Sequence, residues 1–159
     1  MKNDHSVRGG FAAAVLRLMD AWEANLVLNL RLWCDGPKGQ AAVWNEYRKL
    51  CSGRQAQAEC RAFEHLLNTL IDNSYRPLVR HKVGCACVGV DESIFVNLVR
   101  TASAGHLTDA ALIATLIAGP AKAEHIAVLA GEVGASVRRM HAEIKDDLPE
   151  LGANVSWLH

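Results

Sequence analysis

Apolar residues recur every three or four positions along most of the chain, which is the period of an α-helix. All four prolines fall between or at the ends of these periodic segments, as expected because proline disrupts a helix interior. The sequence therefore predicts an all-α, single-domain bundle of about six helices, with an irregular segment near residues 75–90. The expected helices cover residues 11–34, 40–51, 55–73, 91–105, 108–119 and 120–145. The fourth and fifth are expected to begin with Asp91 and Thr108 as their N-caps.

The chain of 159 residues has the size of one domain. It shows no internal repeat and no linker long enough to divide it. We therefore expect residues 1–159 to form a single helical domain, with about 1–9 and 146–159 as terminal extensions.

The end of the first expected helix has an ambiguous pattern, because its leucines alternate from Leu26 to Leu32 as in a strand. No turn signal separates this stretch from what precedes it, so helix is the preferred interpretation and strand stays open. A helix that is apolar on most sides must be buried by neighbouring helices or by a partner chain.

The last expected helix carries a strip of small residues beside its apolar stripe. Two of them are Gly131 and Gly134, and each glycine inside a helix costs about 1 kcal/mol relative to alanine. Close approach of another helix explains the strip, either within the monomer or across a dimer axis.

Composition excludes several functions. Lys+Arg and Asp+Glu both number 17, so the chain lacks the cationic excess that non-specific nucleic-acid binding and attraction to anionic membranes require. No apolar stretch is long enough to span a membrane. Five cysteines in a core-rich chain of this length favour a reducing, cytoplasmic location.

Candidate chemistry gathers just before the fourth expected helix, where His81, Cys85 and Cys87 form an H-x3-C-x-C motif. Imidazole and thiolate are preferred zinc ligands, and His106, Asp91 or water would supply the fourth position. Two alternatives stay open. The cysteines are either small buried hydrophobes, or redox-active thiols favoured by the nearby helix N-terminus.

Other motifs have simpler explanations. Asp91 and Glu92 are adjacent, which suits a helix cap and a first-turn acid better than a shared acid–base site. Residues 36–39 (Gly-Pro-Lys-Gly) contain part of a phosphate-loop pattern but favour an interhelical turn. The Glu64-His65 and Glu124-His125 pairs lack the Glu-x-x-His spacing of di-metal bundles.

The leading hypothesis from the sequence is a non-enzymatic protein that acts through self-association, as a homodimer or other homo-oligomer, and through protein contacts. It rests on the apolar 26–33 stretch, the small-residue strip, the absence of a catalytic constellation and an apolar tail that contains Val155, Trp157 and Leu158. The alternatives are a metal- or thiol-dependent protein that uses His81, Cys85 and Cys87, and a small-molecule sensor with an apolar pocket between helices.

Overall fold

The computed structural model describes residues 14–147, and this part of the chain contains six α-helices. A two-residue antiparallel pairing joins β1 (Ala14–Val15) to β2 (Cys87–Val88), and a short 3-10 helix, η1 (Leu16–Leu18), follows β1. The all-α, six-helix prediction and the irregular segment before the fourth helix are confirmed. The helices are α1 (Ala21–Cys34), α2 (Pro37–Leu50), α3 (Gly53–Asp72), α4 (Val90–Ser103), α5 (Leu107–Ala114) and α6 (Pro120–Asp147).

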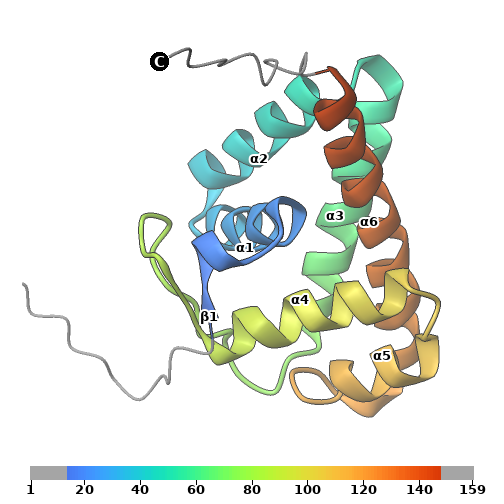
Figure 1. The fold of residues 1–159 in the computed structure, drawn as a ribbon. Coiled ribbons are helices and arrows are strands. Elements are labelled where there is room, and N and C mark those ends of the chain that lie inside the picture. Colours follow the sequence, from blue (N-terminus) through green and yellow to red (C-terminus); the bar gives the residue numbers. More distant parts are fainter. Residues whose placement is uncertain (1–13, 148–159) are drawn as a thin grey trace, which may run out of the picture.

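The longest helix, α6, connects two groups of helices (Figure 1). It packs against α4 and α5 near its beginning and runs antiparallel to α3, while α1 packs mainly on α2. α1 also contacts α4 and α6, so that it lies between the two groups. This position brings the last turn of α1 close to the start of α4.

The first helix begins at Ala21, so the prediction of a continuous helix from residue 11 is wrong. Val15 and the preceding residue pair with β2, and the Leu16 amide donates to the Ala86 carbonyl at 2.9 Å. Long-range pairing of the backbone therefore overrides the local helical pattern. Residues 11–13 and the expected terminal extension 1–9 lie outside the described part, whereas α6 continues to Asp147.

The 26–33 stretch is helical, as preferred, and it is buried within this one chain. Leu26, Leu30 and Trp33 are at most 5% exposed, and the Trp33 ring packs edge-on against the Phe63 ring at 6.1 Å between centroids. Intramolecular contacts therefore account for the all-round apolar pattern. The same core contains residues from all six helices, among them Val43, Leu66, Leu70, Phe95, Val99, Ala110, Ile126 and Met140.

The small-residue strip also serves packing within the chain. A Cβ atom on Gly134 would lie 2.6 Å from the Ser103 Cβ, and one on Gly131 would lie 3.3 Å from the Ala102 carbonyl oxygen. The two glycines thus let α6 approach α4 closely, the first of the two explanations offered for the strip.

Only Gly36 of the 36–39 segment belongs to the turn between α1 and α2, because α2 already begins at Pro37 and not at residue 40 as predicted. Gly36 has a φ of +96° and precedes Pro37, which occupies the first turn of α2. Gly39 is buried against α1, because a Cβ there would lie 1.8 Å from the Leu32 carbonyl oxygen. The turn therefore depends on Gly36 for its conformation, and the first part of α2 depends on Gly39 for close approach to α1.

Two predicted helix caps are wrong. The N-cap of α4 is Gly89 rather than Asp91, and the N-cap of α5 is His106 rather than Thr108. At α4 the reason is that Glu92, the third helical residue, accepts the Gly89 amide hydrogen at 2.8 Å, which is half of a capping box. The Asp91 carboxylate is thereby left for other partners.

Candidate functional site

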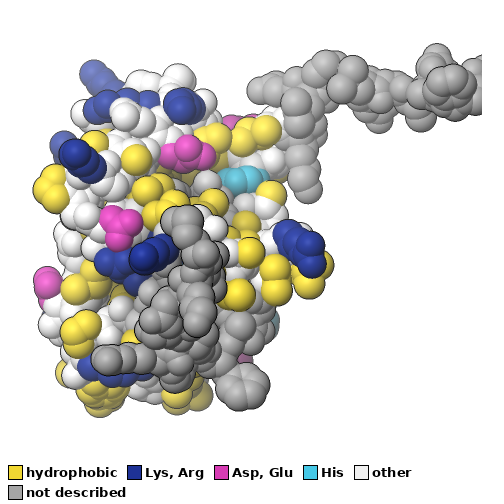
Figure 2. Space-filling model, turned by 90° about the vertical axis from the view of Figure 1, so that its left-hand side faces the viewer, with side chains coloured by type: hydrophobic (Ala, Val, Ile, Leu, Met, Phe, Trp, Pro, Cys, Tyr) yellow, Lys and Arg dark blue, Asp and Glu magenta, His cyan; other side chains and the backbone are white. Residues whose placement is uncertain are grey.

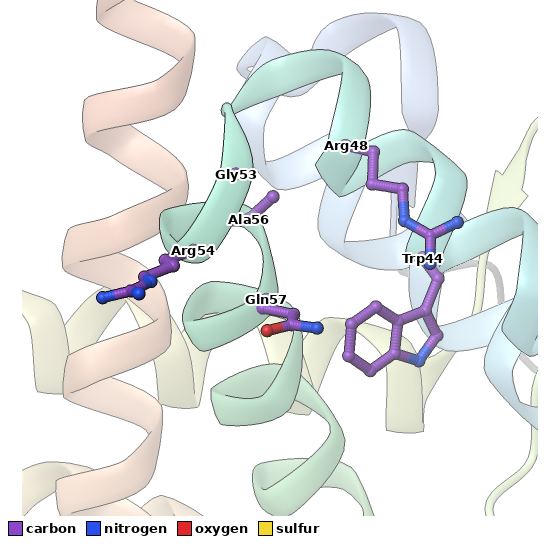
Figure 3. A pocket seen from close by; sticks show the side chains of 6 residues that line it. All are labelled: Trp44, Arg48, Gly53, Arg54, Ala56 and Gln57. Carbon is purple, nitrogen blue, oxygen red and sulfur yellow. The ribbon is translucent and has the colours of Figure 1, made fainter.

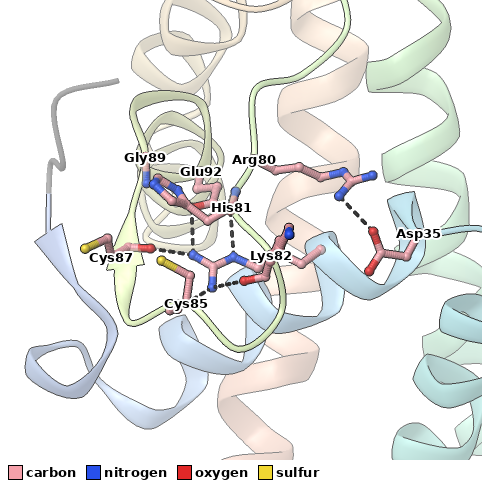
Figure 4. Close-up of polar contacts among 9 residues, drawn as sticks. Asp35, Arg80, His81, Lys82, Cys85, Cys87, Gly89 and Glu92 are labelled. Atoms are coloured by element: carbon pink, nitrogen blue, oxygen red, sulfur yellow. Dashed lines mark hydrogen bonds and ion pairs between the residues drawn. The ribbon is translucent and has the colours of Figure 1, made fainter. Parts of the chain in front are cut away.

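The chain between α3 and α4 is fixed to the helices by Arg31, a fully buried residue of α1. Its Nε and one terminal nitrogen bind the two Glu92 oxygens at 2.7 and 2.9 Å. The remaining hydrogens go to the backbone carbonyls of Lys82 (3.2 Å), Cys85 (2.7 Å) and Cys87 (2.6 Å), as Figure 4 shows. All five N–H donors of the guanidinium are thus satisfied, as a charge removed from water requires.

Glu92 is the acceptor side of this arrangement and is also fully buried. Besides Arg31 and the Gly89 amide, its carboxylate accepts the His81 amide hydrogen at 2.9 Å. Burial by itself raises the pKa of this carboxyl, but the hydrogen bonds from Arg31, Gly89 and His81 outweigh burial and hold the pKa below its ordinary value. Glu92 therefore stays ionised and ties the loop to the beginning of α4.

Asp91 is held by a separate arginine. Arg76 binds both of its carboxylate oxygens, at 2.6 and 3.0 Å, and the Val79 amide donates to it at 2.7 Å. The hydrogen bond from Arg76 is the main reason why the pKa of Asp91 lies below its ordinary value, although burial opposes it. The two adjacent acids thus have different partners, which agrees with the prediction that they do not share a site.

His81 lies beside Glu92, with its Nδ1 atom 3.3 Å from a carboxylate oxygen. An ionised carboxylate only accepts hydrogen bonds, so Nδ1 is the donor in this contact and the ring presents Nε2 on its other side. The ring also needs the absence of a side chain at Gly89, because a Cβ there would lie 3.1 Å from it. His81 is therefore oriented and 29% exposed, with one nitrogen available.

Cys85 and Cys87 are presented on one side of the fixed backbone. Their carbonyls both point to Arg31, while the carbonyl of Ala86 between them points the other way, to the Leu16 amide. Alternating carbonyls mark an extended chain, in which residues two apart have their side chains on the same face. Both side chains are half-buried, and Figure 4 shows both sulfur atoms near the beginning of β2.

The other three cysteines lie in a different environment. Burial raises the pKa of the Cys34 and Cys51 thiols and raises that of Cys60 to about 12. Thiolate is the reactive form of cysteine, so these three thiols are poor nucleophiles near neutral pH. All five described cysteines are free.

The structure brings the three predicted metal ligands into one loop without assembling a zinc site. Within residues 14–147, no group of three or more His, Cys, Asp or Glu side chains is placed to hold a metal ion. Of the suggested fourth ligands, Asp91 is bound by Arg76, and His106 lies at the beginning of α5 with an exposed side chain. The zinc hypothesis stays a prediction.

A hollow of about 450 Å³ lies between α2 and α3 (Figure 3). Trp44 and Arg48 line it from α2 and Gln57 from α3, while Arg54 extends away from Trp44 on the other side of α3. The hollow is open, and arginine and glutamine side chains share its lining with Trp44 and Ala56, unlike the apolar pocket between helices that a small-molecule sensor would need.

Basic side chains form no single patch on the face shown in Figure 2. They stand singly or in small groups, separated by hydrophobic and uncharged side chains. This distribution differs from the continuous basic surface typical of nucleic-acid-binding proteins.

Comparison of the chain with protein-family models, curated proteins and solved structures finds no match to any of them. Across the described residues, no helix combines the length and the apolar character needed to cross a membrane.

Because Asp91 and Glu92 are held in their ionised forms, the free energy of unfolding should depend on pH. Asp91 and Glu92 have ordinary pKa values of 3.8 and 4.5 and lower values in the folded protein. Their contribution is therefore complete above pH 4.5 and is lost as the pH falls through the folded values. Urea titrations followed by circular dichroism at pH 7, 5, 4 and 3 should show that the free energy of unfolding falls as the pH is lowered. In the Glu92→Gln variant this fall should be smaller.

The matched control for this prediction is Glu124→Gln, on the exposed side of α6. Its profile should follow that of the wild type. Equal losses between pH 7 and pH 3 in wild type and Glu92→Gln would contradict the role given to Glu92.

Proposed function

We propose that this is a thiol-dependent protein whose working groups are Cys85 and Cys87, with His81 beside them. The observation that carries the proposal is that one buried guanidinium, Arg31, binds the backbone carbonyls of both cysteines. The thiols are thereby held on one face, and their positions are set before any ligand or reactant arrives.

The chemistry of the pair supports this assignment. Thiolates are nucleophiles and soft metal ligands, and a site held in place by its supporting residues loses little entropy when it binds or reacts. The buried charged network costs desolvation energy, so a purely structural loop is better served by apolar packing. Free thiols also need a reducing compartment, which favours the cytoplasm as the place of action.

Thiol titration tests the proposal. Native protein treated with Ellman's reagent should show two fast-reacting thiols and three slow ones, because burial disfavours the thiolate of Cys34, Cys51 and Cys60. Cys85→Ser and Cys87→Ser should each remove one fast thiol, whereas the control Cys51→Ser should leave both.

The opposite result would be fast reaction confined to the other cysteines, with Cys85 and Cys87 reacting only after denaturation. That outcome would remove the thiol-dependent function.

A second candidate function is self-association. Two of the features that suggested it, the 26–33 stretch and the small-residue strip, are buried by contacts within one chain, and the apolar tail lies outside the described residues. A different observation favours it: Tyr75, Leu112 and Leu116 are each more than 60% exposed. Tyr75 and Leu116 line the same small hollow, and Leu112 lies one helical turn before Leu116. We propose that this apolar surface contacts a second copy of the chain.

Sedimentation velocity at 5–50 µM protein, a range of about tenfold, tests this candidate through mass action. The wild type should shift from monomer towards dimer, and Leu116→Asp should stay monomeric. The control Leu18→Asp, at the exposed leucine of η1, should behave as the wild type does. A wild type that stays monomeric throughout would end the proposal.

A further inference from the structure

We infer that Cys85 and Cys87 form a two-coordinate site for a soft monovalent metal ion, of which the cuprous ion is the biological example. The inference rests on the proposed function, since it requires that these two thiols are accessible. It assigns them one class of ligand and distinguishes that class from zinc.

The spacing of the two cysteines suits two sulfurs on one ion. Residues two apart in an extended chain have Cα atoms roughly 6.6 Å apart. A linear S–metal–S unit with metal–sulfur bonds of about 2.3 Å spans roughly 4.6 Å between sulfurs. Two side chains that stand on the same face and lean slightly towards each other cover that span without movement of the backbone.

The same spacing disfavours a disulfide between the two cysteines. A disulfide needs its sulfurs about 2.05 Å apart and its Cα atoms mostly 5.5–6 Å apart. Shortening the chain at this point would displace the Cys85 and Cys87 carbonyls from Arg31, which binds them at 2.7 and 2.6 Å. The loop therefore keeps the pair reduced and open.

The surroundings disfavour a tetrahedral zinc ion. Zinc takes three or four protein ligands, and no such group is assembled among the described residues. The nearest carboxylates are already bound to Arg31 and Arg76. Soft thiolates with no further ligand select cuprous ion, which accepts low coordination.

Binding of a cuprous ion to the two thiols is an exchange of protons for metal and involves no electron transfer. One cuprous ion replaces the protons of two thiols, so two protons are released and the resulting bis-thiolate complex carries one negative charge. The exposed Lys82, three residues before Cys85, adds positive charge to the same loop. Because protons are released, the apparent affinity should rise with pH.

Anaerobic titration of the reduced protein with Cu(I), in competition with the chromophoric chelator bicinchoninate, tests the inference. One ion per chain should be withdrawn from the chelator. Cys85→Ser and Cys87→Ser should each abolish this, whereas His81→Ala and the control Cys51→Ser should retain it. X-ray absorption should show two sulfur neighbours and no nitrogen.

Two results would overturn the inference. One is a requirement for His81 with nitrogen in the metal shell, together with preferential binding of zinc, which would restore the three-ligand zinc hypothesis. The other is the absence of stoichiometric copper while Ellman's reagent still finds two fast thiols, in which case the proposed function stands alone. If those thiols are also unreactive, both proposals fail.

Discussion

Replacing Arg31 with methionine is expected to lower the free energy of unfolding by about 3–5 kcal/mol, the usual cost of removing one partner of a buried ion pair. The substitution leaves the Glu92 carboxylate buried without its guanidinium, and three backbone carbonyls lose their donor. Urea unfolding followed by circular dichroism measures the change. Arg31→Lys should also destabilise the protein, because an ammonium cannot reproduce the planar five-donor contact.

The control is Arg80→Met, which breaks an ion pair with Asp35 whose side chains are 29% and 43% exposed. Exposed pairs contribute at most about 1 kcal/mol, so the control should lose little stability. A loss for Arg31→Met no greater than for Arg80→Met would show that Arg31 does not anchor the loop.

Gly39→Ala is expected to cost roughly 3 kcal/mol, the upper part of the range for overpacking a well-packed site. The new Cβ would lie 1.8 Å from the Leu32 carbonyl oxygen and 2.7 Å from its carbon. These are backbone atoms inside α1, so relief requires the two helices to separate. Thermal and urea unfolding of the variant measure the effect.

Gly84→Ala provides the matched control, because nothing lies within 4 Å of a Cβ at that position and its φ is not positive. It should be neutral or stabilising by about 0.4–1 kcal/mol through its effect on the unfolded chain. Equal stability of the two variants would contradict the close packing of α2 on α1.

The helical architecture could be predicted because its signals are local. The 3.6-residue period gives six helices, and the bounds predicted for the helices after the first lie within three residues of the observed ones, except that α5 ends at Ala114 and not at residue 119. The predicted start of the first helix was wrong because residues 14 and 15 pair with Cys87–Val88, which are more than 70 residues away. No pattern near residue 14 carries that information.

The candidate site was found only in part. The H-x3-C-x-C motif indicated the loop, because its residue types are those of metal and thiol chemistry. The anchor, Arg31, was missed, although one signal was present: it is the only charged residue in the 26–33 stretch, which is apolar apart from Arg31 and Asn29. Its partners Glu92 and the loop carbonyls lie 51 to 61 residues away, and backbone carbonyls leave no mark in a sequence.

The self-association hypothesis shows a related limit of sequence patterns. An apolar face predicts burial but does not say whether the covering helix belongs to the same chain or to another. Here α4 covers Gly131 and Gly134, and the 26–33 stretch lies in the core of the same chain. The exposed leucines of α5 and its following turn were visible as apolar residues, but their exposure depends on how α5 sits on α6.

The central claim is that Arg31 holds the Cys85 and Cys87 thiols side by side, and bridging of the two by phenylarsine oxide tests it most directly. This trivalent arsenical condenses with two neighbouring thiols and releases one water. Peptide mapping by mass spectrometry should find one arsenic group joining Cys85 and Cys87 in the native wild type, with both protected from iodoacetamide. If both cysteines remain open to alkylation after the treatment, the thiols do not stand together and the account is wrong.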